Sequence, residues 1–313
     1  MSTNHARCKD VPSHLCPEAK TLLSQEMSTR IRAVLKGTMV GHGRLMDLYN
    51  KIVWLMAEAG AVRTRGYVIC APPGNGKTSL GAMVTAKHPL MPPSPDSLEQ
   101  VSSKDCAVQV NLAGARTGKG FFVRLLAALQ SDSTRGTAIE MELRTKDILR
   151  RANCRLLIID EMQDLLNAPA REQLKVIETI KNLMTELRIP VLAMGTVPAQ
   201  ENFHADPHMM ARFKTIELPL WSANDELAAM LKGIESTLPL PSPSNLAEPK
   251  VMQYLVKSTG GVLAEIVLKI RQAAAYAIAS GDDRITLEML EGNLRMPDPE
   301  QFLGSPIKEV CVS

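Results

Sequence analysis

The fold is decided by one short stretch of the chain, Ala71-Pro72-Pro73-Gly74-Asn75-Gly76-Lys77-Thr78. The stretch matches the pattern G-x-x-x-x-G-K-[ST] except at its first position, where alanine replaces glycine. Residues 67–70 before it are apolar and predict a buried strand, and residues 79–84 after it predict an opening helix. A loop in this setting presents successive backbone N–H groups to a phosphate. A glycine-rich turn with an incidental lysine is the alternative interpretation.

The residues of this loop have distinct expected roles toward ATP and Mg²⁺. We expect Lys77 to reach the β- and γ-phosphate oxygens and the hydroxyl of Thr78 to bind Mg²⁺. Ala71 reduces the backbone freedom at the loop entrance, whereas Gly74 and Gly76 stand where backbone and phosphate come closest. The full set of expected nucleotide-binding residues is Pro73, Gly74, Asn75, Gly76, Lys77, Thr78 and Ser79.

A second segment, residues 156–161 (L-L-I-I-D-E), is an apolar run that ends in two acids. This pattern is typical of a buried parallel strand that brings carboxylates to the C-terminal edge of a sheet. We expect Asp160 to hold Mg²⁺ through water and Glu161 to polarise the attacking water. Acids after a strand also cap helices, a duty for which Asp164 is better placed.

The pattern of the remaining segments predicts an α/β fold. Strand patterns at 106–112 and 191–196 alternate with helical patterns at 121–129 and 172–188, which indicates a parallel sheet with helices on both faces. After residue 221 the pattern is helical and predicts a small all-α lid domain. We expect a flexible N-terminal arm over residues 1–25 and a nucleotide-binding α/β domain over 26–221, which includes a helix over 30–60. The lid is expected over 222–295 and a C-terminal tail over 296–313.

Composition narrows the class of protein. The chain has 313 residues, of which 45% are hydrophobic, and we expect neither a membrane-spanning segment nor a signal peptide from its pattern. No membrane partner is therefore expected. The six cysteines show no metal-ligand spacing, which favours a reduced, cytoplasmic protein. The net charge of +3 is too small to indicate nucleic-acid binding by itself, so local clusters must carry that argument.

Four features together resemble the AAA+ class of P-loop ATPases: the loop at 71–78, the acidic strand at 156–161, a polar residue that ends the strand pattern at 191–196, and a helical lid. The resemblance gives Thr196 the role of sensor 1, whose hydroxyl orients water or the γ-phosphate; a Gly-Thr turn leaving a strand is the alternative. Arg212 precedes the short strand pattern at 215–219. It resembles the arginine finger that one AAA+ subunit contributes to the active site of its neighbour. Such a guanidinium neutralises charge in the transition state. An ordinary surface or salt-bridged arginine is the alternative interpretation.

Several segments resemble, more narrowly, the transposition regulators of the TniB/TnsC type, over about residues 40–295. They are R-T-R-G-Y-V-I-C, R-L-L-I-I-D-E-M-Q-D-L-L, P-V-L-A-M-G-T, A-R-F-K-T-I-E-L-P-L-W and S-T-G-G-V-L-A-E-I-V-L-K-I-R-Q-A-A. The resemblance implies that ATP-bound subunits assemble on double-stranded target DNA as a ring or filament. It also implies that they recruit a transposase and a targeting protein, and that slow or partner-stimulated hydrolysis resets the complex.

Sequence-independent DNA binding requires cations that face the phosphates. Arg116 and Lys119 follow the strand pattern at 106–112, where the pore-side loops of the resembled family track the DNA backbone, and Arg135 is a further candidate. Thr117 as a helix cap and Lys119 as a solvated first-turn residue are the alternatives. The basic run over residues 144–155 is interspersed with acids, which favours a solvated helix face.

Two departures from the AAA+ pattern leave other functions open. Ala71 is one, and the other is Glu265, which stands near the position where many members have a sensor 2 arginine. Glu265 argues against a lid arginine that contacts nucleotide and favours weak or partner-dependent turnover. One alternative function is a helicase loader or origin initiator, although no recognition helix is evident after residue 295. The other is a nucleotide-dependent scaffold that hydrolyses little.

Overall fold

The computed structural model describes residues 12–90, 104–196 and 211–292, and these residues form two compact units. Unit 1 comprises Met1–Arg44 and Leu220–Ser313, and unit 2 comprises Leu45–Pro219. The chain therefore enters unit 2 after Arg44 and leaves it after Pro219. The expected tail over residues 296–313 lies outside the described residues, and the division of the chain into four segments stays a prediction.

Unit 2 is built on a five-stranded parallel sheet in the order β2-β3-β4-β1-β5. Every residue of β3 and β4 except Arg155 is buried, as expected for strands that are covered on both faces. The predicted α/β fold with a parallel sheet and flanking helices is confirmed. The strands are β1 (Gly66–Cys70), β2 (Cys106–Asn111), β3 (Cys154–Asp160), β4 (Val191–Gly195) and β5 (Phe213–Glu217).

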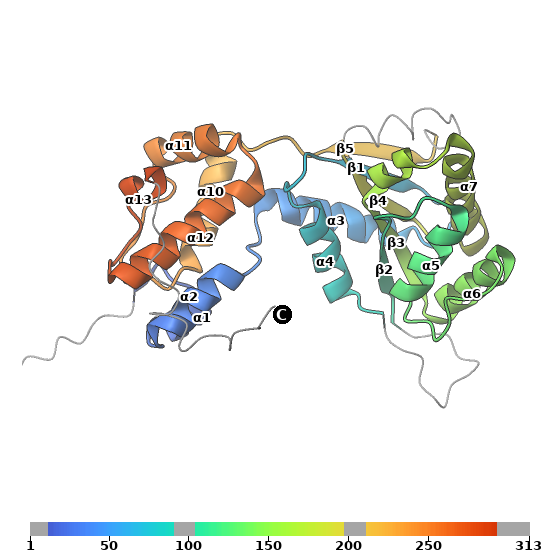
Figure 1. Cartoon of the computed structure of the whole chain (residues 1–313), viewed down its shortest axis with the longest axis horizontal. Helices are drawn as coiled ribbons and strands as arrows, with labels where there is room; N and C mark the ends of the chain where they lie inside the picture. Colours follow the sequence, from blue (N-terminus) through green and yellow to red (C-terminus); the bar gives the residue numbers. More distant parts are fainter. Residues whose placement is uncertain (1–11, 91–103, 197–210, 293–313) are drawn as a thin grey trace, which may run out of the picture. The chain divides into compact units, whose positions relative to one another are not determined.

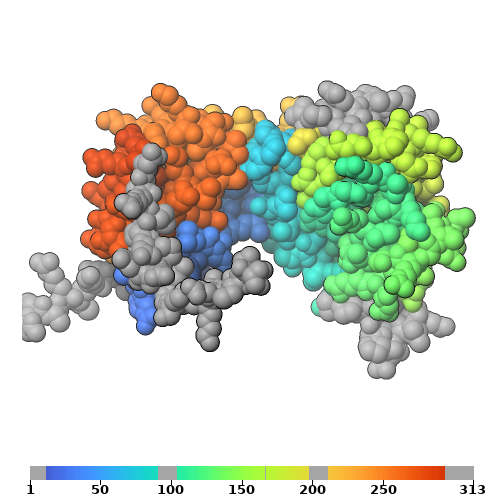
Figure 2. Space-filling model, in the orientation of Figure 1, coloured from blue at the N-terminus to red at the C-terminus, as the bar shows by residue number. Residues whose placement is uncertain are grey.

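Successive residues of β1 contribute to different cores, which shows that the sheet of unit 2 has a core on each face. Val68 and Cys70 pack in the core with α5, α6 and α7, whereas Ile69 packs in the core with α3 and α4. Figure 1 shows these two groups of helices on opposite sides of the sheet, and Figure 2 shows the surface of α5 and α6 in green. The helices are α3 (Gly43–Ala57), α4 (Lys77–Lys87), α5 (Gly118–Ala128), α6 (Ala138–Arg151), the 3-10 helix η1 (Met162–Asn167) and α7 (Ala170–Leu187).

Unit 1 is helical in its described residues. Its core contains Trp221, Leu227 and Ile270, together with Ile31 and Val34 from the N-terminal part of the chain. Helix α2 packs against α12, so segments far apart in the sequence share this core. The helices are α1 (Pro17–Leu23), α2 (Met27–Lys36), α10 (Asp225–Ser236), α11 (Pro249–Thr259), α12 (Leu263–Ser280) and α13 (Leu287–Glu291).

The helical pattern over residues 30–60 forms two helices, α2 and α3, because α2 ends at its C-cap, Gly37. Gly37 has a φ of +68°, a conformation that residues with a side chain rarely adopt. A Cβ at this position would lie 2.0 Å from the guanidinium carbon of Arg271, so a larger residue here would also force the Arg271 side chain to move. Within the arm that was expected to be flexible, residues 17–23 form α1.

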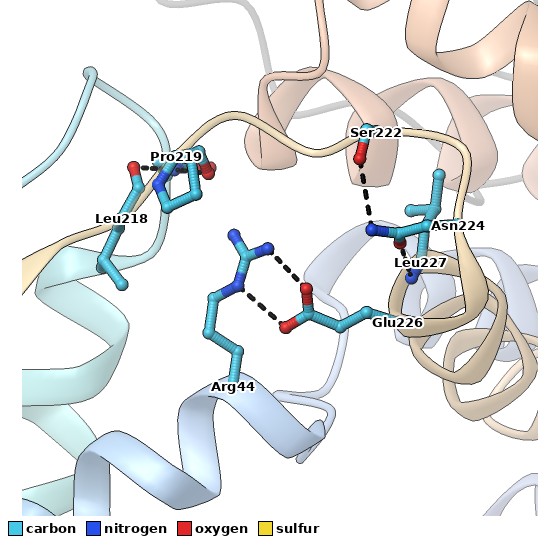
Figure 3. Close-up of polar contacts among 8 residues, drawn as sticks. Arg44, Leu218, Pro219, Ser222, Asn224, Glu226 and Leu227 are labelled. Atoms are coloured by element: carbon cyan, nitrogen blue, oxygen red, sulfur yellow. Dashed lines mark hydrogen bonds and ion pairs between the residues drawn. The ribbon is translucent and has the colours of Figure 1, made fainter.

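Two side chains organise the start of α10 in unit 1. Arg44 donates two hydrogen bonds to the carboxylate of Glu226, from Nε at 2.9 Å and from Nη2 at 2.6 Å (Figure 3). The guanidinium of Arg44 also lies 4.2 Å from the ring centroid of Trp221. Asn224 caps the helix by accepting a hydrogen bond from the N–H of Leu227 at 3.0 Å (Figure 3).

None of the helices in the described ranges is both long enough and apolar enough to cross a membrane.

Candidate nucleotide-binding site

The phosphate-binding loop connects β1 to α4, as the sequence predicts. Gly74 and Gly76 have φ values of +72° and +90°, and Gly76 is the N-cap of α4. Helix α4 begins at Lys77, so its unpaired N–H groups and the positive end of its dipole lie at the loop. The backbone of this segment thus has the features that favour binding of a phosphate group.

Lys77 is buried within this loop, with 7% of its surface exposed. Its Nζ donates hydrogen bonds to the carbonyl oxygens of Ala71 at 2.7 Å and Pro72 at 3.0 Å. Burial lowers the pKa of Lys77, and the negative charges of Glu161 and Asp160 act in the opposite direction. Phosphate oxygens that replaced the two carbonyls would give the ammonium group stronger, charge-assisted hydrogen bonds.

Asp160 ends β3 with only 1% of its surface exposed and meets the loop through Thr78. Its Oδ2 accepts a hydrogen bond from Oγ1 of Thr78 at 3.3 Å, as well as one from Nε2 of Gln109 at 3.2 Å. Its Oδ1 accepts from the N–H of Glu161 at 2.9 Å. The structure therefore brings together a hydroxyl and a carboxylate, the type of oxygen ligands that fit Mg²⁺ beside a nucleotide. Gln109 was not predicted from the sequence.

Glu161 follows β3 with a left-handed backbone, at φ +59° and ψ +39°. This conformation costs a residue with a side chain about 1 to 2 kcal/mol, so the surrounding contacts must maintain it. Nε2 of Gln163 donates a hydrogen bond to Oε2 of Glu161, and Oε1 of Gln163 accepts from the N–H of Thr196 at 3.2 Å. Gln163 thus connects two predicted site residues. Asp164, the candidate helix cap, instead accepts from the N–H of Gly114 at 3.1 Å.

Asn75 connects the loop to the last residues of unit 2. Its Nδ2 donates hydrogen bonds to the carbonyl oxygens of Leu218 and Pro219, both at 3.0 Å; these two residues are labelled in Figure 3. Asn75 is 5% exposed, and its Oδ1 is buried without a hydrogen-bond partner among the described residues. The side chain of Asn75 therefore stabilises the conformation of the loop through the backbone at 218–219. The sequence pattern did not indicate this role.

The family model described as "Bacterial TniB protein" matches residues 30–223. The chain belongs to the TniB family. No curated protein matches the chain. Three solved structures resemble it in fold: the ORC2 protein of Aeropyrum pernix in ADPNP–ADP complexes, the ORC1 protein of Aeropyrum pernix in complex with DNA, and Cdc6p of Pyrobaculum aerophilum.

These likenesses show the fold and extend over most of each chain. The ORC2 structure has 19% identity and a TM-score of 0.59, over 83% of this chain and 70% of that chain. The ORC1 structure has 15% identity and a TM-score of 0.55, over 90% and 69%, respectively. Cdc6p has 15% identity and a TM-score of 0.56, over 87% and 74%. The fold of this TniB-family chain is therefore that of the AAA+ ATPases.

Arg212 of this TniB-family chain lies directly before β5 and contacts α7. Its backbone oxygen accepts a hydrogen bond from the N–H of Gly66 at 2.9 Å, which fixes the chain beside β1. Its Nη1 donates to Oγ1 of Thr185 at 3.0 Å. This contact is compatible with the finger and with an ordinary surface arginine, so the expected role of Arg212 stays a prediction.

The predicted DNA-binding side chains of the TniB-family chain are all exposed: Arg116, Lys119 and Arg135. Between the first two, Thr117 caps α5 by accepting a hydrogen bond from the N–H of Gly120 at 2.9 Å. The alternative interpretation of Thr117 as a helix cap is therefore confirmed. The N–H of Gly118 donates to Oε2 of Glu172 at 3.1 Å, so an acid of the chain itself occupies this helix start.

The basic run over residues 144–155 was expected to be a solvated helix face, and two members contradict this: Lys146, which is buried on α6, and Arg155, which lies on strand β3. Lys146 on α6 is only 7% exposed and forms ion pairs with Glu142 at 2.6 Å and with Glu186 at 2.8 Å. Since Glu186 lies on α7, the ammonium group joins the two helices. The two carboxylates compensate for the loss of water around Lys146 and raise its pKa against the effect of burial.

Proposed function

We propose that this TniB-family protein is an ATP-dependent, DNA-binding regulator of transposition that forms oligomers on its target. One observation carries the proposal: the loop residue Thr78 meets Asp160 at a sheet edge where Glu161 follows directly. In a chain whose residues 30–223 match the TniB family, this edge provides the groups that nucleotide hydrolysis requires.

In this proposal the loop residues bind the phosphates, and Thr78 and Asp160 hold Mg²⁺. When bound there, Mg²⁺ would supply positive charge that stabilises the phosphates. Lys77 exchanges its carbonyl partners for phosphate oxygens, while Glu161 accepts a proton from water and Thr196 orients that water. Arg212 acts on the nucleotide of a neighbouring subunit, which makes hydrolysis dependent on assembly.

The proposed DNA contacts are the exposed cations Arg116, Lys119 and Arg135. Repeated in each subunit of an oligomer, they contact the backbone phosphates of double-stranded DNA and give binding without base readout. A transposase and a targeting protein are the proposed partners, in keeping with the family, and hydrolysis resets the complex. A helicase loader or origin initiator is the alternative, and a scaffold with little hydrolysis is a second one.

The proposal is tested by measuring DNA binding with and without ATP and Mg²⁺ over a range of salt concentrations. We expect ATP to increase the affinity for duplexes of unrelated sequence and Lys77→Ala to remove this increase. In Arg116→Ala the salt dependence of binding should decrease by about one unit of slope, because one phosphate contact per subunit is lost. Lys250→Ala, at an exposed position on α11, is the matched control. Equal DNA affinity with and without ATP would contradict the proposal.

A further inference from the structure

The side-chain amide of Gln163 joins two residues of the candidate site that directly follow two neighbouring strands, β3 and β4. Gln163 belongs to η1, directly after the acidic end of β3, and it is partly buried. Its Nε2 donates to the carboxylate of Glu161, and its Oε1 accepts from the N–H of Thr196, the residue directly after β4. Both ends of the amide are therefore engaged, one with the proposed base and one with the backbone of the proposed sensor.

The strands around Glu161 do not by themselves fix the position of its carboxylate, which is why the hydrogen bonds of Gln163 matter. Strands β3 and β4 pair in parallel, with Ile159 opposite Ala193, so their C-terminal ends lie at the same edge. Glu161 has left the strand in a left-handed conformation, so the ladder of β3 and β4 no longer determines where its carboxylate points. A planar amide has a fixed separation between its donor and its acceptor, so it holds the carboxylate at a defined position relative to β4.

We propose that Gln163 is a positioning residue, which holds the carboxylate of Glu161 against the end of β4 so that base and sensor act as one unit. The inference rests on the proposed ATPase function. Gln163 acts through Glu161 and Thr196, and its two hydrogen bonds are not directed at the phosphate-binding loop. A change at this position therefore affects the rate of hydrolysis and leaves the affinity for nucleotide unaltered.

Two substitutions separate the two hydrogen bonds of Gln163. Gln163→Met keeps the length of the side chain and removes both hydrogen bonds. Gln163→Glu keeps an acceptor for the N–H of Thr196, loses the donor to Glu161 and adds a like charge beside it. The matched control is Gln173→Met on α7, where Nε2 of Gln173 donates to the backbone oxygen of Ala168 at 2.8 Å.

The first measurement is steady-state ATP hydrolysis by the full chain with DNA, combined with the Kd of a slowly hydrolysed ATP analogue. We expect both Gln163 variants to lose about 10-fold to 100-fold in kcat, as is typical when the support of a functional carboxylate is removed. The Kd should stay within about 2-fold of that of the wild type, and Gln173→Met should retain the wild-type kcat. A wild-type kcat in Gln163→Met, or a Kd that weakens as much as kcat falls, would overturn the inference.

The second measurement is hydrogen exchange of the Thr196 amide by NMR, which requires no hydrolysis. We expect this amide to exchange faster in Gln163→Met, where its acceptor is gone, and to stay protected in Gln163→Glu. Unchanged exchange in Gln163→Met overturns the inference even if the wild-type chain hydrolyses no ATP. Conversely, a wild-type chain that binds ATP without turnover contradicts the proposed ATPase function, while the exchange result still decides the role of Gln163.

Discussion

Glu161 is the residue on which the proposed chemistry depends, and its surroundings suit a base that must be held in place. It follows the buried Asp160, which already interacts with Thr78, so the two acids have separate partners. Asp160 is fixed among Thr78, Gln109 and the backbone, as expected for a metal ligand. Oε2 of Glu161 accepts a hydrogen bond from Gln163, which helps to hold the carboxylate in place.

Glu161→Gln should therefore abolish turnover and preserve ATP binding. The amide cannot accept a proton at neutral pH, so we expect kcat to fall by about 100-fold or more, the usual contribution of a general base. Hydrolysis and analogue binding, measured on the same preparation, check this expectation. Glu178→Gln on α7, an exposed position, serves as the control. Unchanged turnover in Glu161→Gln would refute the role of Glu161 as base.

The sequence predicts those site residues whose roles follow from a local pattern. The phosphate-binding loop lies between β1 and α4, and Thr78 contacts Asp160, because a strand–loop–helix motif and parallel strands fix both features. The sequence does not predict Gln163 as a site residue, because its contacts depend on the left-handed conformation of Glu161 and on the neighbouring strand. Asn75 was assigned to the loop, but its bonds to Leu218 and Pro219 bridge positions far apart in the chain.

At the level of elements, local pattern predicted the strands better than the breaks between helices. The apolar runs gave β1, β3 and β4 close to their observed positions, because buried parallel strands are apolar over their whole length. The break between α2 and α3 was not predicted, since it depends on the positive φ of Gly37 and on the contact with Arg271. A single glycine in a helical pattern does not reveal such a partner.

The hydrogen bonds between Arg44 and Glu226 join the start of α3 to the first turn of α10 in unit 1 (Figure 3). Hydrogen bonding from Arg44 lowers the pKa of Glu226. A carboxyl group with a lowered pKa in the folded state stabilises the fold above its unfolded pKa, and this contribution is lost as the pH falls through the folded pKa. Glu226→Gln should therefore lower the free energy of unfolding at pH 7 by about 1 kcal/mol or less.

Chemical denaturation of the wild type and Glu226→Gln at pH 7 and at pH 3 checks this sign. The difference between the two proteins should be present at pH 7 and should shrink toward pH 3, where protonation of Glu226 weakens its bond to Arg44. Glu288→Gln, in the first turn of α13, is the control for loss of an acid near a helix start. A difference that stays constant or grows toward pH 3 would contradict the assignment.

At the level of the whole molecule, the proposal requires that neighbouring subunits share one active site. The guanidinium of Arg212 donates a hydrogen bond to Thr185 of its own chain, at an exposed position where assembly can replace it. Mixing Lys77→Ala with Arg212→Ala subunits should regain ATPase activity, because some interfaces then combine an intact loop with an intact arginine. The rate of each variant alone is the baseline. An arginine that acts within its own chain would give no gain on mixing.

The central claim is that the loop at residues 71–78 and the acidic edge at Asp160 bind a nucleotide with Mg²⁺. Isothermal titration calorimetry of the folded full chain with ATP and Mg²⁺ tests it most directly. We expect heat of binding to one site per chain, its loss in Lys77→Ala, and its retention in Lys87→Ala at the other end of α4. Absence of heat from the wild type with ATP, ADP and a slowly hydrolysed analogue would show that this loop and acidic edge do not bind nucleotide.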